Sequence, residues 1–184
     1  MFDAIVLAGG RARRLGGVAK PQLEVAGRTL LDHAVAAVTG AQRVVVVGPE
    51  QPVAGKVTFC RENPPGAGPV AAIGAALPHT RAEVLVVLAA DLPWIAPAIP
   101  VLLAALPESG AALLVDADGR VNYLAGAWRR RDLAAALRAL GDASGASARA
   151  LASLVAQVHV PDQAGWGRDC DTWDDVARAR SEVP

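Results

Sequence analysis

Cysteine, methionine and aromatic residues are scarce in this chain. Its 184 residues include two cysteines and one methionine, and aromatic side chains make up only 4% of the sequence. The two cysteines, Cys60 and Cys170, stand far apart and form no Cys-x-x-Cys pair. A disulfide framework and a structural zinc site are therefore both disfavoured.

Long apolar runs and an excess of one charge are also lacking. No apolar stretch reaches the roughly 18 residues that a membrane-spanning helix requires, and residues 1–3 lack the basic leader of a signal peptide. We therefore expect a cytoplasmic protein without membrane contact. Because 18 basic and 18 acidic side chains balance to a net charge of zero, nucleic acid is not expected as a partner.

Apolar residues, in contrast, are abundant. The hydrophobic fraction is 53% and the charged fraction is 20%, a composition that excludes a disordered chain. A length of 184 residues fits a single domain over residues 1–184, with enough chain to bury a substantial core.

Short β-branched runs alternate with helical patterns along the chain. The continuous apolar runs at 4–8, 43–48 and 83–90 are typical of strands covered on both faces in a parallel sheet. Helices are expected over 69–77, 98–106 (with an interruption at Pro100), 131–140 and 147–155, and from capping boxes at Thr29 and Thr172. Segments 112–115 and 120–127 flank a hairpin turn, and 157–160 is a further strand. This order predicts an α/β fold, a three-layer α/β/α sandwich around a mostly parallel sheet with an inserted antiparallel hairpin.

The loop after the first predicted strand has the composition of a phosphate-binding site. Glycines at the carboxyl end of a parallel strand let backbone N–H groups approach phosphate oxygens. Arg14 and Lys20 would add positive charge to this cradle. The alternative is an ordinary turn with a solvated basic patch, which the combination of Arg14, Gly16 and Lys20 at these spacings disfavours.

Two common phosphate-binding motifs are missing from this loop. It contains no Gly-x-Gly-x-x-Gly, and Gly17 is followed by Val18 where a Walker A loop needs lysine. A dinucleotide-dependent dehydrogenase and a P-loop NTPase are both disfavoured.

Residues 7–20 read Leu-Ala-Gly-Gly-x-x-x-Arg-x-Gly-x-x-x-Lys, which resembles the signature of the molybdenum-cofactor nucleotidyltransferases. The segment is most similar to their guanylyltransferase branch, and later segments follow in the family's order over nearly the whole chain. The resemblance implies a Rossmann-like fold of the nucleotide-diphospho-sugar transferase type. It also implies that the nucleotide and its phosphates contact Leu7, Ala8, Gly9, Gly10 and Lys20.

Asp91 follows the third apolar run and precedes Leu92 and Pro93. A carboxylate just beyond a buried strand can hold a hard cation, and Mg²⁺ accepts one or two carboxylates together with phosphate oxygens. The alternative is a turn cap, a role that Asp often fills. Because Asp91 matches the family's strand-Asp-x-Pro site, the resemblance implies that it binds Mg²⁺ and contacts the nucleotide.

Residues 169–172 are similar to the family's Asn-x-Asn-Thr-Pro segment, with both Asn replaced by Asp and Pro replaced by Trp173. An acidic pair at this spacing lies on one face of an extended segment. We expect Asp169 to complete the Mg²⁺ shell opposite Asp91, although Asp171 is an alternative metal ligand. Asp171 is otherwise expected to contact the acceptor or to assist capping of the last helix.

The Pro- and Gly-rich loop over 61–69 is expected to shape the base pocket. The family usually places an Asp here to accept hydrogen bonds from guanine, whereas this chain has Glu62 and Asn63, with Gly68 before the next helix. This departure leaves the choice between guanine and cytosine open. Gly48 is a second departure, because relatives often carry Asn there. Arg149 falls where relatives have basic residues for the acceptor's phosphate.

These motifs together imply a Mg²⁺-dependent nucleotidyltransferase with Arg14, Lys20 and Asp91 as its catalytic residues. The resemblance implies GTP and molybdenum-bound molybdopterin as substrates, GMP as the transferred group and pyrophosphate as the leaving group. A cytidylyltransferase or another NTP:phosphate-acceptor transferase remains an alternative. So does a non-catalytic nucleotide-binding module in molybdoenzyme assembly. Contact with a molybdoenzyme or chaperone is expected, in a monomer or small homo-oligomer.

Overall fold

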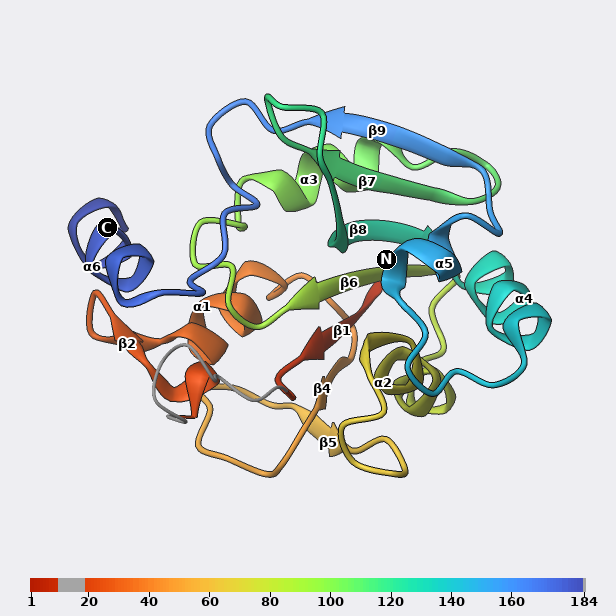
Figure 1. Ribbon diagram of the computed structural model, residues 1–184, viewed down its shortest axis with the longest axis horizontal. Coiled ribbons are helices and arrows are strands. Elements are labelled where there is room, and N and C mark those ends of the chain that lie inside the picture. Colours follow the sequence, from red (N-terminus) through yellow and green to blue (C-terminus); the bar gives the residue numbers. More distant parts are fainter. Residues whose placement is uncertain (10–18, 184) are drawn as a thin grey trace.

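The computed structural model describes residues 1–9 and 19–183 (Figure 1). A seven-stranded sheet runs through the molecule in the order β5-β4-β1-β6-β8-β7-β9. Its strands are β1 (Asp3–Leu7), β4 (Val44–Val47), β5 (Thr58–Cys60), β6 (Val84–Ala89), β7 (Ala111–Val115), β8 (Val121–Arg129) and β9 (Gln157–Pro161). A separate ribbon pairs β2 (Glu24–Val25) with β3 (Arg28–Thr29) in antiparallel fashion.

Helices cover both faces of the sheet, which confirms the three-layer sandwich. The α-helices are α1 (Leu30–Ala37), α2 (Pro69–Ala76), α3 (Ala98–Ala105), α4 (Arg130–Leu140), α5 (Ala148–Ala152) and α6 (Trp173–Glu182), and the short 3₁₀ turns are η2 (Lys20–Gln22) and η3 (Leu77–His79). Among the described residues, no helix is both long and apolar enough to cross a bilayer.

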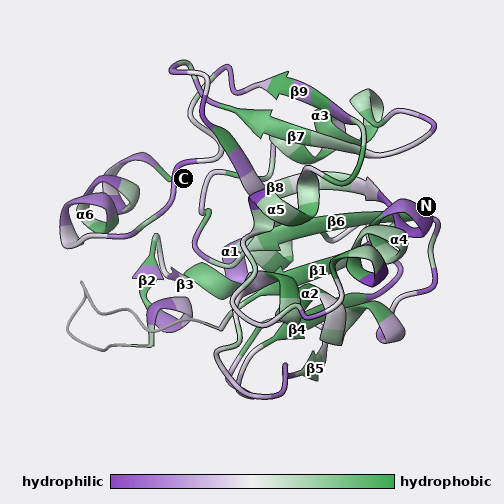
Figure 2. Cartoon of the chain, turned by 45° about the vertical axis from the view of Figure 1, so that its right-hand side comes forward, coloured by the Kyte–Doolittle hydropathy of each residue, from purple (hydrophilic) through white to green (hydrophobic). Residues whose placement is uncertain are grey.

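The two faces of the central strands belong to two separate cores. Along β1, Ala4 and Val6 pack with α1 and α3, whereas Ile5 and Leu7 pack with α2, α4 and α5. Successive side chains of a strand point to opposite faces, so a strand between two helical layers must be apolar at every position. This is why the predicted runs are continuous rather than alternating, and why β1, β4 and β6 are green in Figure 2.

The predicted hairpin is confirmed, and the structure shows how it joins the sheet. β8 pairs antiparallel with both β6 and β7, whereas β7 and β9 are parallel. β8 is thus the strand that runs against the other six. At the tip of the hairpin, the carboxylate of Asp116 accepts hydrogen bonds from the amides of Asp118 and Arg120, at 2.9 and 2.8 Å.

The predicted interruption of a helix at Pro100 is wrong, because α3 is continuous. Pro100 is the third residue of this helix. An amide in the first turn has no intrahelical acceptor, so a proline there removes no hydrogen bond. Both predicted capping boxes are confirmed: Thr29 and Asp32 open α1, and Thr172 and Asp175 open α6.

Helix α6 and the β2–β3 ribbon pack together in a third, smaller core. Its buried members are Leu23, Val25, Leu30, Cys170, Val176 and Ala179. The guanidinium of Arg180 also donates to the carbonyl of Glu24, at 3.1 Å. This small core holds the C-terminal helix beside the segment that carries Lys20.

Candidate active site

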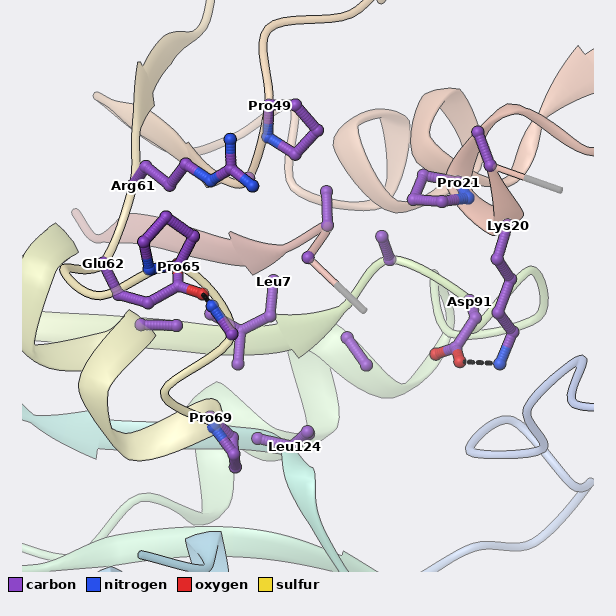
Figure 3. Close-up of a pocket in the computed structure, with 18 of the residues that line it drawn as sticks. Leu7, Lys20, Pro21, Pro49, Arg61, Glu62, Pro65, Pro69, Asp91 and Leu124 are labelled. Atoms are coloured by element: carbon purple, nitrogen blue, oxygen red, sulfur yellow. Dashed lines mark hydrogen bonds and ion pairs between the residues drawn. The ribbon is translucent and has the colours of Figure 1, made fainter. Parts of the chain in front are cut away.

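A cavity of about 1030 Å³ opens at the edge of the sheet where parallel strands end. It is bordered by residues that follow β1, β4 and β6 directly, by the loop before α2, and by Leu124 of β8. This is the edge at which open α/β sheets bind ligands. Figure 3 shows Lys20 and Asp91 at one end of the cavity, Arg61 and Glu62 at the other, and Leu7 between them.

The start of the predicted phosphate loop lies on the cavity wall. Leu7, Ala8 and Gly9 all line it, and the amide of Ala8 donates to the carbonyl of Val47 at 2.8 Å. Gly10 and Arg14 were predicted to contact the nucleotide and to assist catalysis, but they lie outside the described residues.

Gly48 explains how the end of β4 fits against this loop. A Cβ atom built at Gly48 would lie 3.0 Å from both the carbonyl carbon and the oxygen of Ala8. Backbone atoms cannot yield as a flexible side chain can, so a larger residue would push the start of the loop away. Gly48, at a position where relatives often carry Asn, therefore allows the end of β4 to lie close to the loop that follows β1.

Lys20 joins two carboxylates that are 71 and 151 residues away in sequence. Its ammonium donates to Asp91 and, at 2.5 Å, to Oδ1 of Asp171. Burial acts to lower the pKa of Lys20, but the charge of Asp91 and the hydrogen bonds to both carboxylates outweigh it and raise the pKa above its ordinary value. The lysine is thus a permanent cation at this end of the cavity.

The segment that carries Asp169 and Asp171 is fixed to the loop after β6. The amide of Cys170 donates to the carbonyl of Asp91 at 3.1 Å, and the Cys170 side chain is fully buried in the third core. Burial is the main cause that raises the pKa of the Cys170 thiol to about 12, so it stays protonated. Asp171 lines the cavity.

Asp169 lies close enough to its acidic neighbours for their charges to act on it. Burial, followed by the charges of Asp171 and Asp91, raises the pKa of Asp169 above its ordinary value. Mutual repulsion of this kind is relieved when a cation binds among carboxylates.

The acidic cluster has one feature that fits a divalent cation. Oδ1 of Asp91 is buried and has no hydrogen-bond partner among the residues that the structure describes. Within residues 1–9 and 19–183, no group of three or more His, Cys, Asp or Glu side chains is arranged to hold a metal ion. Mg²⁺ takes only one or two carboxylates from a protein and keeps most of its shell for waters and phosphate oxygens.

The loop before α2 forms the opposite end of the cavity and separates the two candidate base contacts. Glu62 is buried and lines the cavity, and its Oε1 accepts a hydrogen bond from the amide of Gly66 at 2.7 Å. Asn63 is exposed and instead lines a second hollow beside α2 and the loop after α4. Gly68, the residue before α2, has φ of 103° and lines the main cavity.

Arg149, a candidate for binding the acceptor, is exposed on α5 and lines neither of these two hollows. Sequence reasoning missed several cavity residues, among them Pro49, Gln51 and Leu124. These side chains belong to no motif and reach the cavity only through the sheet order. Sequence reasoning also missed the stacking of Arg168 on Trp94, whose 74-residue separation leaves no local signal.

The fold and the cavity together define a class of protein. An open, mostly parallel α/β sheet with a cavity at its carboxyl edge, and with a lysine and carboxylates at one end of that cavity, is typical of a nucleotide-binding protein. The family of the MobA-like NTP transferase domain matches residues 4–160, and the chain belongs to that family of nucleotidyltransferases.

Individual relatives agree with this assignment. The molybdenum cofactor guanylyltransferase of Shewanella frigidimarina is 30% identical over 148 residues, which cover 77% of this chain and 76% of that protein. The molybdenum cofactor guanylyltransferase of Acidiphilium cryptum is 35% identical over 136 residues, or 68% of this chain and 65% of that protein. The solved structure of 2-C-methyl-D-erythritol 4-phosphate cytidylyltransferase from Thermus thermophilus has the same fold, with a TM-score of 0.75 at 22% identity over 100% of this chain and 99% of that one.

Proposed function

We propose that this chain transfers GMP from GTP to molybdenum-bound molybdopterin in the cytoplasm, with release of pyrophosphate. The names of the two relatives support this reaction for the chain. The observation that carries the proposal is the polarity of the cavity: a lysine and carboxylates at one end, and a buried glutamate in a restrained loop at the other. This arrangement suits a nucleoside triphosphate, whose phosphates and base lie at opposite ends of the molecule.

At the end of the cavity that contains Lys20 and Asp91, positive charge and backbone amides would bind the phosphates. The backbone amide of Gly9, continued by Gly10 and Arg14, would receive the phosphates, because the Ala8 amide is already bonded to Val47, and Lys20 would neutralise part of their charge. Lys20 must then exchange one of its carboxylate partners for a phosphate oxygen when the nucleotide enters.

Asp91 and Asp169 would hold Mg²⁺, with Asp171 close by. When bound, the ion supplies charge neutralisation and a fixed orientation for the phosphate oxygens. The orphaned Oδ1 of Asp91 and the mutual repulsion of the carboxylates support this assignment.

The reaction forms one P–O bond and breaks another. An oxygen of the acceptor's terminal phosphate attacks the α-phosphorus of GTP, and the bond to the bridging oxygen of the β-phosphate breaks, so that pyrophosphate leaves. The attacking oxygen is already anionic, so no side chain has to remove a proton from it. Catalysis by the chain is then mainly orientation of the two phosphates and stabilisation of charge by Lys20 and the loop amides.

At the end of the cavity that contains Glu62, where we place the base, Glu62 rather than Asn63 would contact guanine. A carboxylate offers acceptor positions beyond the one that the Gly66 amide occupies, and guanine presents N1–H and N2–H₂ as neighbouring donors. Glu62 is only 8% exposed and lines the cavity, so a base bound at this end could donate to the acceptor positions of the carboxylate that remain.

The proposal is tested by incubating the protein with Mg²⁺, molybdenum-bound molybdopterin and either GTP or CTP, and measuring pyrophosphate together with the dinucleotide product. We expect turnover with GTP, little with CTP, and loss of turnover in Lys20→Ala. A preference for CTP would assign the chain to the cytidylyltransferases. Nucleotide binding without any pyrophosphate would favour the non-catalytic module.

A further inference from the structure

The segment over 165–171, which is neither a helix nor a strand, carries Asp171 to the cavity wall, with the exposed Asp169 two residues before it and outside the wall. It connects β9 to α6, and Asp169 and Asp171 lie at its end. Groups that share a metal ion must be held to within about half an ångström of their working positions. A loop of this kind therefore needs fixed contacts of its own.

Arg168, directly before Asp169, provides three such contacts. Its guanidinium stacks over the ring of Trp94 at 4.3 Å from the ring centroid. Its Nη2 atom donates to Glu182 at 2.8 Å, and its Nε atom donates to the carbonyl of Gly165 at 2.9 Å. A Cβ atom at Gly165 would lie 2.5 Å from this Nε, so the side chain is folded closely over its own loop.

These contacts attach the acidic segment to the loop that bears Asp91. Trp94 is three residues beyond Asp91 and packs against the core that contains Cys170. The amide of Cys170 in turn donates to the carbonyl of Asp91. The segment is thus tied to the Asp91 loop on both sides of Asp169, by the stacked guanidinium before it and by the Cys170 amide after it.

We infer that Arg168 is a positioning residue, which holds Asp169 and Asp171 beside Asp91 and so sets the affinity of the site for a divalent cation bound with a nucleoside triphosphate. The inference depends on the proposed function, because it assumes that these carboxylates meet the cation. Nothing in the family signature marks position 168, and its role follows only from the contacts in this chain.

The contacts of Arg168 separate this role from folding stability. The side chains of Arg168 and Glu182 are 37% and 42% exposed, and ion pairs at such exposure contribute little to stability. Loss of Arg168 should therefore leave the protein folded while the acidic segment gains freedom.

The experiment measures the dissociation constant of Mn²⁺ by electron paramagnetic resonance in the presence of saturating GTP, for wild type, Arg168→Ala, Arg168→Lys and Arg178→Ala. Arg178 is the matched control, because it also pairs with an acidic residue, Asp175 at 3.7 Å, but is not among the residues that line the cavity. We expect the dissociation constant to rise about tenfold in Arg168→Ala, as is typical when a residue that orients metal ligands is lost. Arg178→Ala should match wild type.

Arg168→Lys distinguishes positioning from charge. Lysine keeps the charge but lacks the planar group that stacks on Trp94 while bonding to Glu182, so its dissociation constant should lie between those of wild type and Arg168→Ala. Equal affinity in wild type and Arg168→Lys would overturn the inference in favour of a purely electrostatic effect.

Two further results would also overturn the inference. One refutes the positioning role of Arg168, and the other refutes the metal site. Unchanged affinity in Arg168→Ala, with wild type binding Mn²⁺ normally, would refute the positioning role and leave the proposed function intact. Absence of Mn²⁺ binding in wild type would contradict the proposed metal site itself. Urea unfolding of each variant confirms that the comparison is between folded proteins.

Discussion

At the level of single residues, the two carboxylate oxygens of Asp91 have different surroundings. One carboxylate oxygen bonds to Lys20, whereas the other is buried without a partner among the described residues. A group with an unsatisfied buried oxygen costs the fold free energy. Asp91 is therefore placed for binding a ligand rather than for stability.

Replacement of Asp91 by asparagine separates its contribution to ligand binding from its contribution to stability. We expect kcat to fall by about 10²–10³-fold, the range found when one group that stabilises transition-state charge is removed. The free energy of unfolding should fall by about 1–3 kcal/mol, because asparagine keeps the shape of the side chain but weakens a mostly buried ion pair to Lys20, whose side chains are 14% and 21% exposed. Steady-state kinetics and urea unfolding of the same preparation measure both. Full activity in Asp91→Asn would contradict its assignment as a metal ligand.

Gly48 and Gly74 form a matched pair for testing the cavity wall. Gly48→Ala brings a Cβ atom to 3.0 Å from the Ala8 backbone, and overpacking of this kind costs about 1–3 kcal/mol. Gly74→Ala lies inside α2 with its nearest atom at 3.9 Å, and should stabilise by about 0.4–1 kcal/mol. Thermal unfolding measures both changes. Equal and small shifts in the two variants would contradict the close approach of β4 to the loop.

The placement of Glu62 and Asn63 shows what the sequence could and could not predict at this scale. Adjacent residues in an irregular loop have no periodicity, so composition alone could not tell which of them faces the cavity. Lys20 and Asp91 were predictable because each follows a recognisable pattern. Their contact with Asp171 depends on the third core and has no signal in the surrounding residues.

At the level of elements, the first turn of α1 is held by charge as well as by its capping box. The carboxylate of Asp32 accepts from the amide of Ala54 at 2.6 Å and from the amide of Thr29 at 3.3 Å. Burial acts to raise the pKa of Asp32, but these hydrogen bonds outweigh it and lower the pKa below its ordinary value.

A depressed carboxyl pKa links this turn to pH. The stabilisation is fully present above the unfolded-state pKa of about 3.9 and is lost as the pH falls through the lower folded-state pKa. We expect Asp32→Asn to cost about 1 kcal/mol at pH 7, and to cost less as the pH falls below 4. Urea unfolding at pH 7 and pH 3 measures this difference, with the exposed Glu50→Gln as control. A cost that does not vary with pH would contradict the role of the carboxylate charge.

Strands with a continuous apolar run and helices with a capping box were predictable from the sequence, whereas very short strands were not. The buried strands β1, β4 and β6 are continuous apolar runs, and α1 and α6 begin at capping boxes, so both kinds were predicted to within a residue or two. β2 and β3 contain two residues each, and β5 contains three. Such strands are too short for any periodicity, and only their pairing with distant segments defines them.

At the level of the whole molecule, the order of the strands in the sheet brings distant parts of the chain together around the cavity. β1 lies between β4 and β6, so the loops that follow these strands meet around one space. The sequence predicted a parallel sheet and a site at its carboxyl edge. It could not predict that Lys20 with Asp91 and Arg61 with Glu62 lie at opposite ends, because this depends on strand order and on the third core.

The most direct test of the account is isothermal titration of GTP and CTP, each with Mg²⁺, into wild type and Glu62→Ala. We expect wild type to prefer GTP by about tenfold or more, since one hydrogen bond to a charged group contributes about 1.5–3 kcal/mol. Glu62→Ala should lose this preference but still bind both nucleotides through the phosphate end. If wild type binds neither nucleotide, or if Glu62→Ala keeps the full preference for GTP, the assignment of the two ends of the cavity is contradicted.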